Sequence, residues 1–232
     1  MSVPIHPNGS NQADSGSYFA HWGIEVGIVE YECIMSVVDA LDLFYKLPCR
    51  SVFSWTSIIS SFVASGEAQE GLNMYERMLT EGVPPNQYTF VCVFKACGII
   101  LDVERGQRLH IEAYKKGFGA DTFVGNTLVS MYGKCGAIKE AEDVFRSMSQ
   151  CDTVSWTAMF SVYIEQREAK KALELYRQMK EQQVNLDDVT LMLSWTAILS
   201  GLLEQGQADK AIQMYGEMQE EEVPLDDVAV NC

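Results

Sequence analysis

Residues 54–78 carry the sequence SWTSIISSFVASGEAQEGLNMYERM, and two later stretches of the chain repeat its layout. These are SWTAMFSVYIEQREAKKALELYRQM at 155–179 and SWTAILSGLLEQGQADKAIQMYGEM at 194–218. Each copy has an apolar-periodic stretch, a break containing Gly or Gln, and a second amphipathic stretch that ends in Tyr-x-x-Met. Similarity of this length is not chance, so the chain contains an internal repeat.

Within the first copy, the apolar positions recur at helical spacing on both sides of the break. They are Trp55, Ile58, Ile59 and Phe62 before Gly66, and Gly71, Leu72, Tyr75 and Met78 after it. The pattern predicts a helix, a tight turn and an antiparallel helix. Because the Trp and Tyr residues lie on these apolar stripes, we interpret them as core residues and not as ligand-binding residues.

A single hairpin of this size exposes one apolar face, which is buried only when further copies stack against it. The predicted fold class is therefore an all-α solenoid of antiparallel helix-turn-helix repeats with a continuous core and a long concave surface. The chain has 232 residues, 47% of them hydrophobic, and no uninterrupted apolar run approaches the roughly 20 residues that span a bilayer. We expect a protein that does not enter the membrane.

The cysteines are odd in number, scattered, and without CxxC spacing, which argues against a disulfide framework or a zinc site. We expect them to be small buried residues at helix contacts. The seven are Cys33, Cys49, Cys92, Cys97, Cys135, Cys151 and Cys232.

Negative charge is concentrated toward the C-terminus. The net charge is −15, and the residues from Glu181 onward contribute −10 of it. Neutralisation of phosphates normally supplies most of the affinity of a nucleic-acid binder. The acidic C-terminal stretch therefore disfavours nucleic-acid binding more strongly than the rest of the chain. The N-terminal residues lack the basic, amphipathic character of a transit peptide, so either targeting is absent or the true start lies upstream.

Two further segments resemble the plant pentatricopeptide repeat family, in the subfamily with alternating long and short units. They are FKACGIILDVERGQRLHIEAYKKGFGAD at 94–121, similar to the long unit, and VGNTLVSMYGKCGAIKEAEDVFRSM at 124–148, similar to the short one. The tetratricopeptide repeat has a similar hairpin, but its Trp-x-x-Leu-Gly-x-x-Tyr signature is absent. The resemblance implies a right-handed superhelical solenoid, and a fragment that lacks the family's C-terminal extension or deaminase domain.

The resemblance divides the chain into units. A disordered segment at 1–20 precedes a degenerate short-type repeat at 21–51, and a truncated tail occupies 227–232. Between them we expect repeats at 52–86, 87–121 (long type), 122–152 (short type), 153–187 and 192–226, with 188–191 as the remnant of a truncated repeat.

In this family the fifth and the last residue of a unit select the base, so the resemblance implies a set of base-selecting pairs. Carboxylates, amides and hydroxyls at a helix start can hydrogen-bond a base edge, but Asp or Asn before a helix is also an ordinary N-cap. The pairs are Thr56 with Asn86, Val91 with Asp121, Asn126 with Asp152, Thr157 with Asp187, and Thr196 with Asp226. By the family's code they favour A, no clear base, U, G and G.

The family also places a side chain that sandwiches the base at the second position of a unit, here Phe53, Tyr88 and Phe123. The basic residues available for phosphates cluster in the two middle units, where we expect RNA to bind first. They are Lys95, Arg105, Arg108, Lys115, Lys116, Lys134 and Lys139.

No enzyme signature is present. His6, His21 and His110 are isolated, the H-x-E with P-C-x-x-C pattern of deaminases is missing, and we interpret His110 as a helix-surface or packing residue. We therefore expect no catalysis, no metal and no cofactor.

The resemblance implies sequence-specific binding of single-stranded RNA, one base per repeat, in organellar RNA processing or C-to-U editing. The implied partners are RNA and editing or processing factors, with no membrane and no small-molecule substrate, in the mitochondrion or chloroplast. Two alternatives remain open: a scaffold whose acidic surface meets a basic protein, and a truncated repeat protein without function.

Overall fold

The computed structural model describes residues 37–184, 195–196, 198–203 and 206–220, and every regular element among them is helical. The chain divides into two compact units, one ending at Pro84 and one beginning at Pro85. None of the described helices is long and apolar enough to cross a membrane. The expected disordered segment 1–20, the remnant 188–191 and the tail 227–232 lie outside the described residues.

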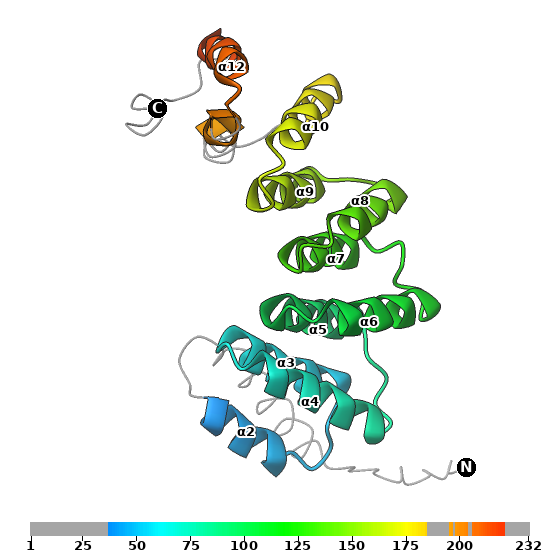
Figure 1. The fold of residues 1–232 in the computed structure, drawn as a ribbon. Helices are drawn as coiled ribbons and strands as arrows, with labels where there is room; N and C mark the ends of the chain where they lie inside the picture. Colours follow the sequence, from blue (N-terminus) through cyan, green and yellow to red (C-terminus); the bar gives the residue numbers. More distant parts are fainter. Residues whose placement is uncertain (1–36, 185–194, 197, 204–205, 221–232) are drawn as a thin grey trace, which may run out of the picture. The chain divides into compact units, whose positions relative to one another are not determined.

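The first unit contains α2 (Val37–Lys46), α3 (Val52–Ala64) and α4 (Ala68–Thr80), with α3 packed against both of the others (Figure 1). The Trp55 ring is fully buried and meets the Phe44 ring edge-on, with 4.7 Å between centroids. From α4, Leu72 and Tyr75 are buried against the same core. The interpretation of Trp55 and Tyr75 as core residues is confirmed.

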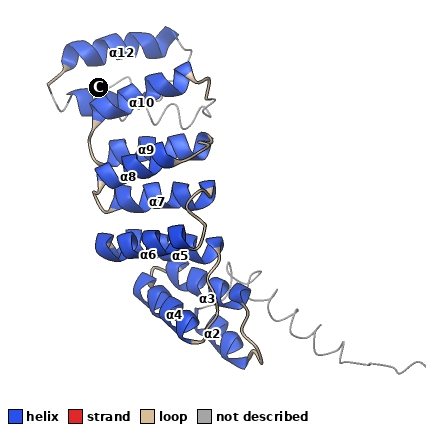
Figure 2. Cartoon of the chain, turned by 90° about the vertical axis from the view of Figure 1, so that its right-hand side faces the viewer, coloured by secondary structure: helices blue, strands red, loops and turns tan. Residues whose placement is uncertain are grey.

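The second unit repeats the hairpin. Its described helices are α5 (Gln87–Ile100), α6 (Val103–Lys115), α7 (Thr122–Lys134), α8 (Ile138–Ser147), α9 (Thr153–Glu165), α10 (Ala169–Glu181) and α12 (Ala208–Glu220). We call α3, α5, α7 and α9 first helices, and α4, α6, α8 and α10 second helices. In this unit the first helices α5, α7 and α9 pack side by side, and each also packs against its own second helix (Figures 1 and 2).

The first helices begin at the residues where repeats were expected to begin: Val52, Gln87, Thr122 and Thr153. The following second helices end within the same expected units. The division at 187 and beyond lies outside the described residues, so the complete set of unit boundaries stays a prediction.

Neighbouring first helices approach closely where one of them lacks a side chain. A Cβ on Gly133 of α7 would overlap the Cγ2 methyl of Val162 on α9. Gln166, at the C-terminal end of α9, donates from Nε2 to the carbonyl oxygen of Gly133 at 3.0 Å. The backbone of α7 is thereby in direct contact with the next pair, both through apolar packing and through a hydrogen bond.

The turn inside each hairpin uses one residue in the left-handed region. Gly66, Gly136 and Gly206 have φ of 86°, 72° and 69°, and Arg167 takes the same place after α9 with φ of 57°. The amide of the next residue, Glu168, donates to the Tyr163 carbonyl at 2.8 Å and closes the end of α9. The expected Gln-containing break in this copy is the turn at Gln166 and Arg167, in which Arg167 takes the left-handed conformation.

The cysteine prediction is confirmed only in part. Cys97 is fully buried on α5, whereas Cys92, Cys135 and Cys151 are half-buried and Cys49 is exposed. The prediction is wrong for Cys49, which precedes α3 in a connecting segment. These five cysteines are free thiols, and the other two lie outside the described residues.

Arg167→Gly should stabilise the protein, because Gly carries no Cβ penalty in the left-handed conformation. The expected gain is about 1 kcal/mol, reduced by whatever the arginine side chain contributes. Urea unfolding followed by far-ultraviolet circular dichroism measures it. The matched control is Gly136→Ala at the corresponding turn after α7, which should destabilise by a similar amount. Destabilisation by Arg167→Gly would contradict the assignment of strain to this turn.

Candidate nucleic-acid interface

The second residue of each first helix points a large apolar side chain into solvent. Phe53, Tyr88 and Phe123 are 45%, 55% and 51% exposed, and Val154 of α9 is also exposed. In the second unit the Tyr88 and Phe123 rings meet edge-on, with centroids 6.1 Å apart. Aromatic faces left in water at matching positions of successive helices can accept flat, stacking ligands.

Asn126 and Asp152, which the family resemblance pairs as base selectors, are in direct contact. Asn126 is only 8% exposed, and its Nδ2 donates to Oδ1 of Asp152 at 3.2 Å. The amide must face the acceptor-only carboxylate with its NH₂ group, which leaves Oδ1 of Asn126 buried and without a partner among the described residues. A buried acceptor without a partner costs about 1–3 kcal/mol until a donor reaches it.

Asp152 also performs the alternative role of a helix cap. Its Oδ1 accepts hydrogen bonds from the backbone N–H and the hydroxyl of Ser155, both at 2.8 Å, at the start of α9. Partial burial would raise the pKa of Asp152, but the hydrogen bonds from Ser155 and Asn126 outweigh it and hold the pKa below its usual value. Capping and the contact with Asn126 use the same carboxylate.

Two other predicted selectors are caps as well. Asn86 accepts from the backbone N–H of Thr89 at 2.9 Å at the start of α5, and Asp121 accepts from Val124 at 3.0 Å at the start of α7. Val91, the expected partner of Asp121, is buried and faces the core. This pair therefore offers one polar group, and its lack of a base preference stays a prediction.

The predicted threonine selectors are half-buried on their helices. The hydroxyl of Thr157 donates to the Thr153 carbonyl at 2.8 Å on α9. Thr56 lies on α3, and Thr196 lies in the described helical residues after α10. Asp187, the expected partner of Thr157, and Asp226, the expected partner of Thr196, lie outside the described residues, so these two pairs stay predictions.

The predicted basic cluster is divided between two sets of helices. Lys95 lies seven residues, two helical turns, after Tyr88 and so shares its exposed face of α5. Lys134 lies eleven residues, three helical turns, after Phe123 and so shares the exposed face of that residue on α7. The remaining five belong to second helices or their ends: Arg105, Arg108, Lys115, Lys116 and Lys139. Sequence clustering alone had not separated these sets.

His110 is a packing residue, as interpreted. Its Nδ1 lies 3.1 Å from the Tyr132 hydroxyl, and burial lowers the pKa of the imidazole. Among the described residues no group of three or more His, Cys, Asp and Glu could hold a metal ion. The chemistry visible on the first helices is that of hydrogen bonding and stacking.

Family comparisons agree with this arrangement. A model of the PPR repeat family matches residues 50–98 and 151–191, and a model of the PPR repeat matches 126–152 and 193–223. The chain belongs to the pentatricopeptide repeat family. The matched stretches include the pair Asn126 and Asp152 and the hairpin α3–α4.

Similar pentatricopeptide repeat proteins come from Arabidopsis thaliana. Pentatricopeptide repeat-containing protein At5g52850, chloroplastic, is 38% identical over 61% of this chain and 16% of its own length. Pentatricopeptide repeat-containing protein At1g15510, chloroplastic, is 36% identical over 73% of this chain and 20% of its own length. The chain thus spans about a fifth of the length of these curated relatives.

Solved pentatricopeptide repeat structures share the fold. PPR10 in complex with an 18-nt psaJ RNA element matches 88% of this chain and 36% of its own with a TM-score of 0.65 at 16% identity. The PPR domain of Arabidopsis thaliana protein-only RNase P 1, in complex with tRNA, matches 76% of this chain and 95% of its own with a TM-score of 0.59 at 13% identity. The predicted all-α solenoid of helical hairpins is confirmed.

Replacing Asp152 separates its two roles. Asp152→Ala should destabilise the protein by about 1 kcal/mol, because the N-cap of α9 is lost. Asp152→Ser, the matched control, keeps an N-cap acceptor and should retain most of that stability while losing the contact with Asn126. Urea unfolding of both variants measures the difference; equal destabilisation by Ala and Ser would contradict the capping role.

Proposed function

We propose that this pentatricopeptide repeat chain binds single-stranded RNA along the exposed faces of its first helices. Phe53, Tyr88 and Phe123 stack on bases, and the residues at the fifth and last positions of the units hydrogen-bond the base edges. The observation that carries the proposal is the buried Oδ1 of Asn126, without a partner among the described residues and three residues beyond an exposed aromatic ring.

By family resemblance, Asn126 with Asp152 prefers U. The acceptor Oδ1 of Asn126 is compatible with that base, because uracil presents an N–H donor at N3, although guanine presents one at N1 as well. Thr157 in the next unit and Asp187 at its end complete, by family resemblance, a preference for G. The expected contiguous target across the units 52–226 is A-N-U-G-G, read with the N-terminus toward the RNA 5′ end.

The wider setting follows from the relatives. Two similar proteins are named chloroplastic, which favours an organellar site of action, in a chloroplast or a mitochondrion. The alternation of a 35-residue unit at 87–121 with a 31-residue unit at 122–152 favours the subfamily with long and short repeats. RNA processing or C-to-U editing would then be performed by a partner that this chain directs to the transcript.

A protein-binding scaffold is the rival function, and the net charge of −15 favours it. An acidic chain attracts basic proteins and repels phosphates over distances of about 10 Å at moderate salt. The two functions differ in what the purified chain binds at low ionic strength. An RNA-binding chain binds RNA of defined sequence, and a scaffold binds a basic protein.

The 232-residue chain should bind a short RNA containing A-N-U-G-G more tightly than an RNA of the same composition with those bases scrambled. Asn126→Ala should weaken binding of the designed RNA about tenfold, since one hydrogen-bonded base contact is lost. Fluorescence anisotropy across a salt titration measures both.

The matched control is Asn73→Ala, the same substitution on the second helix α4, which should leave RNA affinity unchanged. Equal weakening by both variants would contradict base reading by Asn126. Absence of RNA binding by the unmodified chain at low salt would favour the scaffold.

Lysines on the two sets of helices should differ in their contribution to RNA affinity. Lys95→Ala removes a cation from the face that carries Tyr88, so affinity should fall and the slope of log K against log salt should decrease by about 0.7. Lys139→Ala on the second helix α8 removes the same charge elsewhere and should change the slope little. A larger change in slope for Lys139→Ala than for Lys95→Ala would indicate that RNA binds along the second helices.

A further inference from the structure

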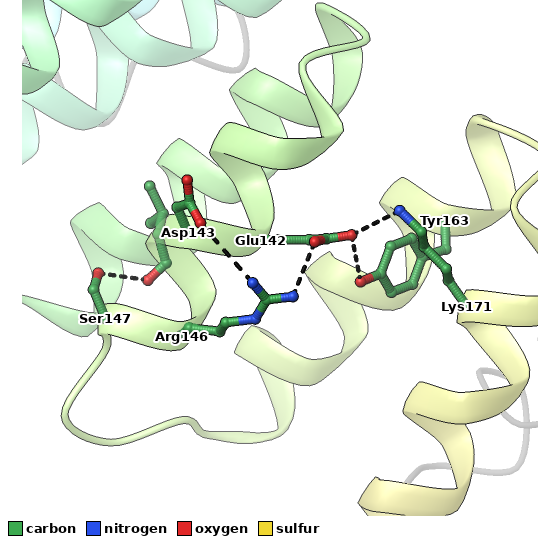
Figure 3. A network of polar contacts seen from close by, with 7 residues as sticks. Glu142, Asp143, Arg146, Ser147, Tyr163 and Lys171 are labelled. Carbon is green, nitrogen blue, oxygen red and sulfur yellow. Dashed lines mark hydrogen bonds and ion pairs between the residues drawn. The ribbon is translucent and has the colours of Figure 1, made fainter.

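Glu142 of α8 is the centre of a polar network between two helix pairs (Figure 3). Its Oε1 accepts from the Tyr163 hydroxyl at 3.1 Å and from Nζ of Lys171 at 3.0 Å. Its Oε2 accepts from the Arg146 guanidinium at 3.0 Å. The Glu142 side chain is only 13% exposed, whereas Lys171 and Arg146 are 46% and 69% exposed, so the carboxylate is shielded from water and its cationic partners are not.

The partners of Glu142 belong to both helices of the next pair. Tyr163 is on α9 and Lys171 is on α10, whereas Glu142 and Arg146 are on α8, the second helix of the preceding pair. A cavity of about 300 Å³ beside the network is lined by Phe145 and Leu175 among others. Apolar contact also joins the pairs, since the Phe145 ring of α8 meets the Trp156 ring of α9 edge-on with 5.1 Å between centroids, and the carboxylate adds a polar contact to it.

Tyr163 connects this network to the proposed RNA face. It lies nine residues, two and a half helical turns, after Val154, and so on the opposite side of α9 from that exposed residue. A contact that holds Tyr163 therefore sets where the other side of α9, with Val154 and the nearby Thr157, stands relative to α7. The helix α7 in turn carries Asn126 and is packed against α8.

The preceding junction contains a related but weaker contact. Tyr132 occupies on α7 the place that Tyr163 occupies on α9, eleven residues into the expected unit, and its hydroxyl lies 3.1 Å from Nδ1 of His110 on α6. That contact joins two groups, with no lysine or arginine in it. Among the described residues, the junction between α8 and the pair α9–α10 has a largely shielded carboxylate with three donors from separate side chains.

We propose that Glu142 is a positioning residue that acts together with the direct packing of α7 on α9 to fix the spacing between Asn126 and Thr157, so that these two residues read adjacent nucleotides. The inference rests on the proposed RNA-binding function and adds to it a residue that does not touch RNA. Loss of the carboxylate lets α9 shift relative to α8, and the requirement for adjacency between the two nucleotides relaxes.

The test compares two RNAs that differ by one nucleotide. The first contains U and G adjacent, as Asn126 and Thr157 require; the second has one nucleotide inserted between them. The 232-residue chain should prefer the first, and Glu142→Gln should reduce that preference at least about fivefold. The matched control is Glu174→Gln on α10, which also lines the cavity and should leave the preference unchanged.

A merely structural role would lower affinity for both RNAs equally. An unchanged preference in Glu142→Gln, with or without a loss of affinity, overturns the positioning role while leaving RNA binding intact. Absence of RNA binding by the unmodified chain overturns the proposed function itself. If Glu142→Gln does not fold, Tyr163→Phe removes only the hydroxyl contact and should lower the same preference in the same direction.

The pH dependence of stability provides a second readout that needs no RNA. Burial would raise the pKa of Glu142, but the hydrogen bonds from Lys171 and Tyr163 outweigh it, with Lys171 and Arg146 also attracting the charge, so the pKa lies below its ordinary value of 4.5. The groups facing Glu142 are those three and Glu174 of α10.

With the folded pKa depressed, the stabilisation is complete above pH 4.5 and is lost as pH falls through the folded value. The stability difference between the unmodified chain and Glu142→Gln should therefore shrink below that pH. A difference that does not change with pH would overturn the role of the Glu142 charge.

Discussion

The close contact between successive first helices is the constraint on which the second unit depends. α7 packs against both α5 and α9, and at Gly133 the α7 backbone itself meets Val162. Each pair can bury its core only against its neighbours. The order and spacing of the helices, and with them the row of exposed second-position side chains, follow from this burial.

Much of the fold could be predicted because the repeat is written in local patterns. The helical spacing of Trp55, Ile58 and Ile59 identified a buried face, and all three are fully buried. The turn after α9 was less predictable. Its left-handed residue is Arg167, although residues other than Gly rarely adopt a positive φ. The hydrogen bond from the Glu168 amide to the Tyr163 carbonyl closes the helix, and it requires this backbone geometry whatever the side chain.

The candidate site was predictable only where two residues are related by the repeat itself. Asn126 and Asp152, which the family pattern pairs, are 26 positions apart and are in direct contact. Glu142 and Lys171 are 29 positions apart and belong to no such pattern, so nothing in the sequence connects them. Clustering of basic residues along the chain was equally uninformative, because the side of the hairpin that a lysine occupies depends on which helix carries it, as Lys95 and Lys139 show.

The double duty of Asp152 limits how such a repeat can be recoded. One carboxylate oxygen accepts from Ser155 to cap α9 and from Asn126 across the junction between pairs. Any replacement at this position must still begin a helix, which favours Asp, Asn, Ser, Thr and Gly. Under the proposed function, the choice of base-selecting side chain here is therefore limited by the chemistry of helix initiation.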